Sequence, residues 1–207
     1  VLKICFVRGG MIFNKDEGLS IKRTALIVSI AYASILFTSA SYQHYLFGTQ
    51  VWDIGLFEQF SWLISEGKIF TISSLRNIAP LQDHFSLLLL PIGLIYKILP
   101  STYTLIGLQS IALGSLPAVA SYLSVNRRVK ATLIWALMSA IVLSPYSFLV
   151  NRGDFHPDVL TVPLMVVAIS EATQSRKYRY YFCLLITLFA KNAQALFGIG
   201  LCFYCFA

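Results

Sequence analysis

Long runs without charged residues constrain the fold of this chain more than any other feature. Three runs of 29, 29 and 21 residues contain no Asp, Glu, Lys or Arg, and they lie between Arg23 and Asp53, between Lys97 and Arg127, and between Lys130 and Arg152. A helix needs about 20 apolar residues to cross roughly 30 Å of hydrocarbon. Each run therefore predicts one membrane-spanning helix.

The composition excludes the other broad classes of protein. Only 12% of the residues are charged and 57% are hydrophobic, whereas a soluble domain carries roughly 25% charged residues. The aromatic content of 14% contradicts intrinsic disorder. The net charge of +7 comes from short Lys and Arg clusters between apolar runs, which is typical of cytoplasmic loops. We therefore expect membrane lipids, and no nucleic acid, as partners.

The predicted fold class is an all-α, polytopic transmembrane helical bundle. A cytoplasmic N-terminal segment, 1–23, is followed by a transmembrane domain, 24–207. The ends of the charged clusters place five spanning helices near 24–47, 102–124, 131–150, 157–175 and 180–207. The chain stops at Ala207 inside an apolar run, so we expect that it is truncated at its C-terminus.

The basic residues orient the bundle. With the N-terminus in the cytoplasm, eleven of the sixteen Lys and Arg residues fall inside and four outside, as the positive-inside rule requires. Six of the nine acids and all three histidines then fall outside. We therefore predict a multi-pass protein of the plasma membrane with its acids and imidazoles gathered on the outer face.

The first external loop, 48–100, is too long for a simple connection. Apolar residues recur at helical spacing over 54–66 and leave a polar opposite side, which predicts an amphipathic helix in the membrane interface. A second apolar piece, 85–98, is interrupted by Pro91 and is too short to span. We expect two interfacial helices in this loop.

Several acids and histidines have both a structural and a functional interpretation. Asp53 opens the helix at 54–66, either as its N-cap or as a general base or cation ligand. The pair Asp83 and His84 forms either an ordinary turn or part of a site. Asp154, His156 and Asp158 alternate along Asn151-Arg-Gly-Asp-Phe-His-Pro-Asp158, which suits a hard cation or a proton relay, or else supplies a helix cap.

Lys191 is the one charge within the last apolar segment. About 12 residues of helix place it roughly 18 Å deep, where a charge is costly without a polar partner or an anionic ligand. Snorkelling of the side chain toward the outer headgroups is the structural alternative.

Four motifs in order resemble a family of prokaryotic membrane proteins classed as a domain of unknown function. The chain carries Trp52-Asp53-x-Gly-x-Phe-Glu-Gln59, then His84-Phe85-Ser86, then Pro91, Tyr96 and Pro100, and then Asp154-Phe155-His156-Pro157. Where the family resemblance implies Lys-Glu in the last helix, this chain has Lys191-Asn192. If that acid has a catalytic role in the family, this copy has lost it.

That family in turn is similar to the GT-C superfamily of membrane glycosyltransferases. The resemblance implies a GT-C-like bundle in which a sugar moves from a polyprenyl-phosphate donor to an acceptor outside the membrane. It implies catalytic roles for Asp53, Asp154 and His156, which are also the candidate ligands of a divalent metal such as Mg²⁺ or Mn²⁺. The expected substrate-binding residues are Glu58, Asp83, His84, Arg152 and Lys191. A transporter or ion-coupled carrier and a non-catalytic membrane scaffold are the alternatives.

Overall fold

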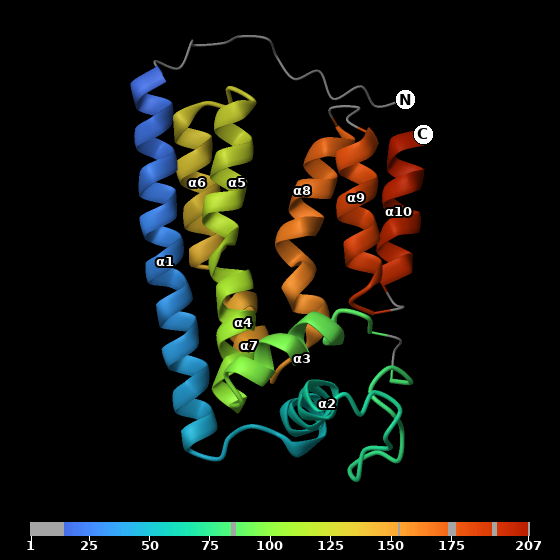
Figure 1. Ribbon diagram of the computed structural model, residues 1–207. Coiled ribbons are helices and arrows are strands. Elements are labelled where there is room, and N and C mark those ends of the chain that lie inside the picture. Colours follow the sequence, from blue (N-terminus) through green and yellow to red (C-terminus); the bar gives the residue numbers. More distant parts are fainter. Residues whose placement is uncertain (1–14, 84–85, 153, 174–176, 192–193, 207) are drawn as a thin grey trace.

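The computed structural model describes residues 15–83, 86–152, 154–173, 177–191 and 194–206, and every regular element among them is a helix (Figure 1). His84 and Asn192 lie outside the described residues. The elements are α1 (Lys15–Tyr45), η1 (Val51–Gly55), α2 (Leu56–Ser65), α3 (Leu89–Ile98), α4 (Thr102–Gly114), α5 (Leu116–Asn126), α6 (Ala131–Val142), α7 (Pro145–Arg152), η2 (Pro157–Thr161), α8 (Val162–Ala172), α9 (Lys177–Leu188) and α10 (Gln194–Phe206).

Three helical stretches are long and apolar enough to cross a membrane: Asp16–Tyr45, Thr102–Asn126 and Ala131–Arg152. They coincide with the three uncharged runs of the sequence. Apolar side chains such as Leu26, Ile27 and Ile30 are more than half exposed on α1. Lipid can solvate such side chains, whereas the backbone polar groups are bonded within the helices. The chain is therefore a helical membrane protein.

Prolines divide two of these stretches. Pro117 lies in the first turn of α5, just after α4 ends at Gly114. Proline has no N–H and its ring clashes with the carbonyl four residues earlier, so the helix bends here. The freed backbone N–H of Ala118 donates to the Ser29 Oγ on α1 at 2.8 Å. Pro145 begins α7 after α6 in the same way.

The predicted single helix over 180–207 is wrong. The structure ends α9 at Leu188 and begins α10 at Gln194, and Figure 1 shows the two helices side by side, running in opposite directions. Lys191 lies in the turn between them. A charge within a continuous apolar helix is costly, and the turn removes Lys191 from such a helix. The backbone N–H of Leu88, just before α3, donates to the Phe189 carbonyl at 2.9 Å.

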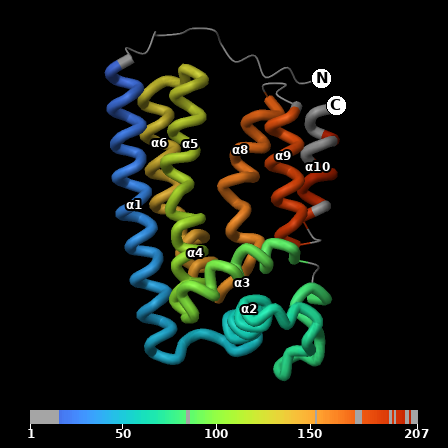
Figure 2. Tube along the Cα trace, viewed as in Figure 1, coloured from blue at the N-terminus to red at the C-terminus, as the bar shows by residue number. Residues whose placement is uncertain are grey.

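The bundle has two chemically different ends. The start of α1, the loop between α5 and α6, and the start of α9 lie at one end, and α2 and α3 lie toward the other (Figure 2). We call the first the basic end because Lys15, Lys22, Arg23, Arg127, Arg128, Lys130, Lys177 and Arg179 lie on its elements. We call the second the acidic end because Asp53, Glu58, Glu66, Asp83, Asp154 and Asp158 lie on its elements.

A buried core joins α2 and α3 to the ends of α1 and α4. Phe60, Leu89 and Leu105 are fully buried in it, and Phe155 from the segment before η2 is 1% exposed. The Phe155 ring packs edge-on against Phe57 with the ring centroids 5.7 Å apart. The buried Phe155 ring therefore anchors the Asp-Phe-His-Pro segment against α2.

Candidate functional site: the carboxylates at the acidic end

Asp154 is the buried carboxylate at the centre of the acidic end. Its side chain is 5% exposed, and both of its oxygens accept from the backbone N–H of Gln50 at 3.1 Å. Its backbone φ is +107°, a conformation that costs a non-glycine residue on the order of 1–3 kcal/mol and persists only where the surroundings hold it. The Gln50–Asp154 contact joins the first external loop to the Asp-Phe-His-Pro segment.

Gln109, in the middle of α4, holds this segment in place. Its side chain is 2% exposed; the Nε2 group donates to the Asp154 carbonyl at 2.9 Å, and Oε1 accepts from the His156 backbone N–H at 2.9 Å. The sequence interpretation missed this residue. The available signal was a single Gln in a run of apolar residues, because a buried amide in lipid needs partners for both of its ends.

Asn151 makes a second buried connection at the end of α7. Its Nδ2 donates to the Leu36 carbonyl on α1 at 2.8 Å, and its Oδ1 accepts from the Ser110 Oγ on α4 at 3.3 Å. Asn151 is 4% exposed. Two neighbouring residues of α4, Gln109 and Ser110, thus fix both sides of the strained Asp154 position.

Three titratable groups near Asp154 influence the pKa of its carboxyl. Burial raises the pKa of the Asp154 carboxyl and the Asp53 carboxylate raises it further, while the Gln50 N–H, His156 and His44 act in the opposite direction. His44, at the end of α1, shares a hydrogen bond of 2.8 Å with the Thr49 hydroxyl, and its ring packs edge-on against Tyr103. The structure thus brings Asp53, Asp154 and His156 together and adds His44.

Asp53 is not a helix cap. The helical segment begins at Val51, three residues earlier than predicted, and its N-cap is Gln50, which makes no side-chain capping bond. Asp53 is half-buried inside η1, and no hydrogen bond from a described residue reaches its carboxylate. The cap interpretation of Asp154 or Asp158 is also wrong, because His156 precedes η2 and no side chain caps that helix.

Two other predicted acids are occupied by structural contacts. Glu58 accepts from the Tyr96 hydroxyl at 3.0 Å and from the Thr102 hydroxyl at 2.6 Å. Burial and the Glu58 carboxylate together raise the pKa of Tyr96 to about 12. Asp83 is 6% exposed, and the Arg76 guanidinium donates to both of its oxygens, at 3.1 and 3.0 Å. Glu58 therefore joins α2 to α3 and α4, and Asp83 fixes the loop before α3.

Among the described residues, neither predicted cation forms a salt bridge with the buried carboxylate of Asp154. Arg152 is exposed at the end of α7, and its Nε donates to Gln43 Oε1 at 2.7 Å. Lys191 is half-buried in the turn between α9 and α10. Arg152 also lines a cavity of about 10 Å³ together with Asp154 and Gln109, which is room for about one water molecule.

A comparison with protein families matches residues 43–206 to the family described as "Predicted membrane protein (DUF2079)". The chain belongs to the DUF2079 family. Comparisons with curated proteins and with solved structures gave no match. The family match covers Asp53, Asp154, His156 and Lys191 and confirms the predicted membership of a membrane-protein family. The description of DUF2079 names no activity.

The metal interpretation is not supported by the described part of this DUF2079 chain. No group of three or more His, Cys, Asp or Glu side chains is placed there so that it could hold a metal ion. Both Asp154 oxygens already face an amide donor.

Proposed function

We propose that this membrane protein is a GT-C-type glycosyltransferase that moves a sugar from a polyprenyl-phosphate donor to an acceptor hydroxyl at the acidic end. The observation that carries the proposal is which of the predicted acids already accept hydrogen bonds from other residues. Described donors occupy the oxygens of Glu58, Asp83 and Asp154, whereas none reaches the half-buried carboxylate of Asp53. Among the four acids predicted for the site, Asp53 is therefore the one whose carboxylate no described donor occupies, and it is available to an incoming substrate.

In the proposed reaction, Asp53 is the general base. Its carboxylate takes the proton of the acceptor hydroxyl as the oxygen attacks the anomeric carbon. The bond from that carbon to the phosphate oxygen breaks, and the polyprenyl phosphate leaves with the electron pair. Asp154 acts as a positioning residue, because its contact with Gln50 fixes the backbone just before η1. Arg152 and Lys191 are the cations at this end that would face the departing phosphate.

An apolar groove supports a lipid-linked donor. It has a volume of about 490 Å³ and runs between α3 and α4 beside Ile95, Leu99, Tyr103 and Gly107, within the size range of small-molecule sites. Tyr103 also contacts the His44 ring, and His44 is one of the groups that influence Asp154. An isoprenoid chain in the groove would therefore have its phosphate end close to the carboxylates.

Transfer from radiolabelled polyprenyl-phosphate sugars tests the proposal on the full chain in detergent. Asp53→Asn should reduce transfer by about 10²–10⁴-fold, the usual contribution of a general base, and should leave expression and thermal unfolding unchanged. Glu66→Gln is the matched control, because Glu66 is an exposed acid at the end of α2 outside the proposed chemistry. Full transfer by Asp53→Asn would refute the base assignment. Donor binding without transfer by the unmodified chain would refute the enzyme and favour a scaffold.

A carrier is the second candidate, and the half-buried Lys191 in the turn between α9 and α10 favours it. Charged groups that are partly buried among membrane helices often mark the path of a substrate or ion. Counterflow of the same sugars and lipids into proteoliposomes tests this alternative. Uptake that is lost in Lys191→Gln and kept in Asp53→Asn would replace the enzyme proposal.

A further inference from the structure

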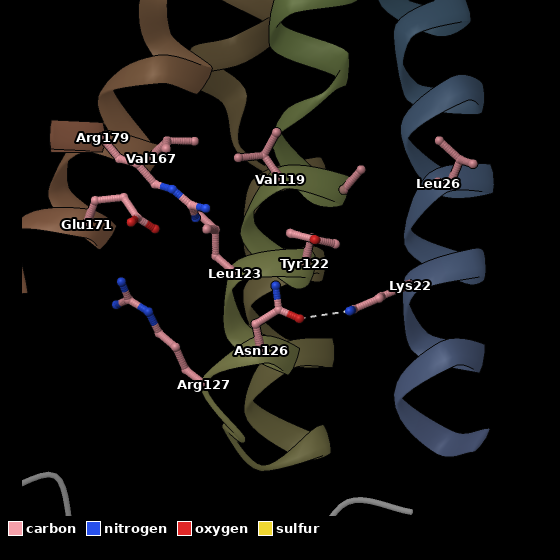
Figure 3. Close-up of a pocket in the computed structure, with 11 residues that line it drawn as sticks. Lys22, Leu26, Val119, Tyr122, Leu123, Asn126, Arg127, Val167, Glu171 and Arg179 are labelled. Carbon is pink, nitrogen blue, oxygen red and sulfur yellow. Dashed lines mark hydrogen bonds between the residues drawn. The ribbon is translucent and has the colours of Figure 1, made fainter. Parts of the chain in front are cut away.

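A large cavity among the described residues lies at the basic end, away from the carboxylates. Its volume is about 590 Å³, and α1, α5, α8 and α9 all contribute to its walls (Figure 3). The proposed glycosyl transfer uses none of its residues. Because this volume is within the range of 300–1,000 Å³ that is typical of ligand sites, we asked which ligand its walls would bind.

The polar side of the cavity is strongly cationic. Lys22, Arg127 and Arg179 line it from three different helices, against a single carboxylate, Glu171. Figure 3 shows Arg127 and Arg179 on the same side of the cavity as Glu171, with Lys22 on the opposite side. With three cations against one anion, the lining carries a formal net charge of +2. A ligand that complements it is anionic.

Hydrogen bonds fix two of the cations that line the cavity. Lys22 Nζ donates to Asn126 Oδ1 at 2.8 Å and lies 4.4 Å from the centre of the Tyr122 ring. Arg127 Nη1 donates to the Thr173 hydroxyl at 3.0 Å, and its Nη2 donates to the Ser170 carbonyl. Arg127 therefore connects α5 to α8 at the edge of the cavity. These contacts fix the side chains of Lys22 and Arg127 at the wall of the cavity.

The remaining lining of the cavity includes apolar side chains that reach the lipid-facing surface. Leu26, Val119 and Val167 line it, and Leu26 is 56% exposed on the outer face of α1. A soluble anion gains nothing from such a wall, whereas the acyl chains of a lipid bury apolar surface there. Basic pockets between membrane helices are suited to anionic lipid headgroups.

We infer that this cavity binds the headgroup of an anionic phospholipid, with the phosphate held by Lys22, Arg127 and Arg179 and the acyl chains along Leu26 and Val119. Phosphate matches both the charge and the donor geometry of paired guanidinium groups. The site is distinct from the proposed donor site, because it lies at the opposite end of the bundle.

Thermal unfolding of the full chain in detergent tests the inference, since a ligand that binds only the folded state raises the unfolding temperature. The probes are dioleoylphosphatidylglycerol, dioleoylphosphatidylcholine and inorganic phosphate, each added separately. The cavity variant is Lys22→Gln combined with Arg179→Gln, which spares the structural contacts of Arg127. The matched control is Arg23→Gln combined with Arg128→Gln, which removes two exposed cations of the same end that do not line the cavity.

Phosphatidylglycerol should stabilise the unmodified chain, and phosphatidylcholine and inorganic phosphate should not. The apparent affinity for phosphatidylglycerol should fall about 30-fold in the cavity variant, because each cation near an anionic lipid contributes roughly fivefold. It should change little in the control. An equal loss in both variants would overturn the inference by showing diffuse attraction to the basic end. Equal stabilisation by phosphatidylcholine would overturn the anionic requirement, and equal stabilisation by inorganic phosphate would overturn the lipid as its source.

Discussion

Replacing Gln109 with leucine should strongly destabilise the protein at the acidic end. The substitution removes the donor to the Asp154 carbonyl and the acceptor for the His156 N–H, each at 2.9 Å. Both lost contacts are made by a side chain that is 2% exposed. Bulk water therefore does not readily hydrogen-bond to the two backbone groups that lose their partner. Each backbone group left without a partner costs about 1–3 kcal/mol. Gln109→Leu should therefore lower the free energy of unfolding by about 2–6 kcal/mol.

Reversible unfolding in mixed detergent micelles measures this loss, with Gln50→Leu as the matched control. The Gln50 side chain is exposed and makes no capping bond, and its contact with Asp154 is made by the backbone N–H. The same exchange of amide for leucine should therefore change the free energy of unfolding by less than about 0.5 kcal/mol at position 50. If Gln109→Leu were no less stable than Gln50→Leu, the Asp-Phe-His-Pro segment would not depend on Gln109, and the reasoning would be refuted.

Three further predictions concern the same framework. Burial, with help from the Asp53 carboxylate, raises the pKa of Asp154 above its ordinary value of 3.8, so the folded state keeps a proton that the unfolded state releases. The unfolding temperature should therefore fall as the pH rises from 3.8 through the raised pKa of Asp154. Asp154→Asn should remove this pH dependence. If the pH profile of Asp154→Asn is unchanged, the dependence belongs to another group. Gly114→Ala would place a Cβ 2.8 Å from the Ala33 backbone nitrogen and should cost about 1–3 kcal/mol in unfolding measurements, whereas Gly107→Ala, with contacts no closer than 3.7 Å, should be neutral or stabilising. Tyr96→Phe removes a hydrogen bond to the Glu58 carboxylate and should cost about 1.5–3 kcal/mol, and Tyr178→Phe, at a ring that is 93% exposed, should cost nothing.

The spanning stretches were predictable because their cause is local. Uncharged runs between Arg23 and Asp53, Lys97 and Arg127, and Lys130 and Arg152 have the length that the hydrocarbon requires, and the structure has a spanning helical stretch in each. The bends at Pro117 and Pro145 follow from proline itself. The break at Lys191 was not expected, because 180–207 contains no proline and the turn is joined through Phe189 to Leu88, a residue far away in the sequence.

For the candidate site too, some features followed from the sequence and others only from the tertiary structure. The sequence by itself determined that the chain is a helical membrane protein. It also predicted that most acids and all histidines gather at one end of the bundle, through the positive-inside rule. Both predictions were possible because hydropathy and charge are properties of single residues. Only the tertiary structure decided which of these acids and histidines are available, since that depends on partners from other helices. It paired Asp83 with Arg76 and Glu58 with Tyr96 and Thr102, and it tied Asp154 to Gln50 and Gln109. Hydrogen bonds between segments about 45 to 104 positions apart leave no periodicity or spacing in the sequence, which is why the partners of Gln109 and Asp154 could be found only in three dimensions.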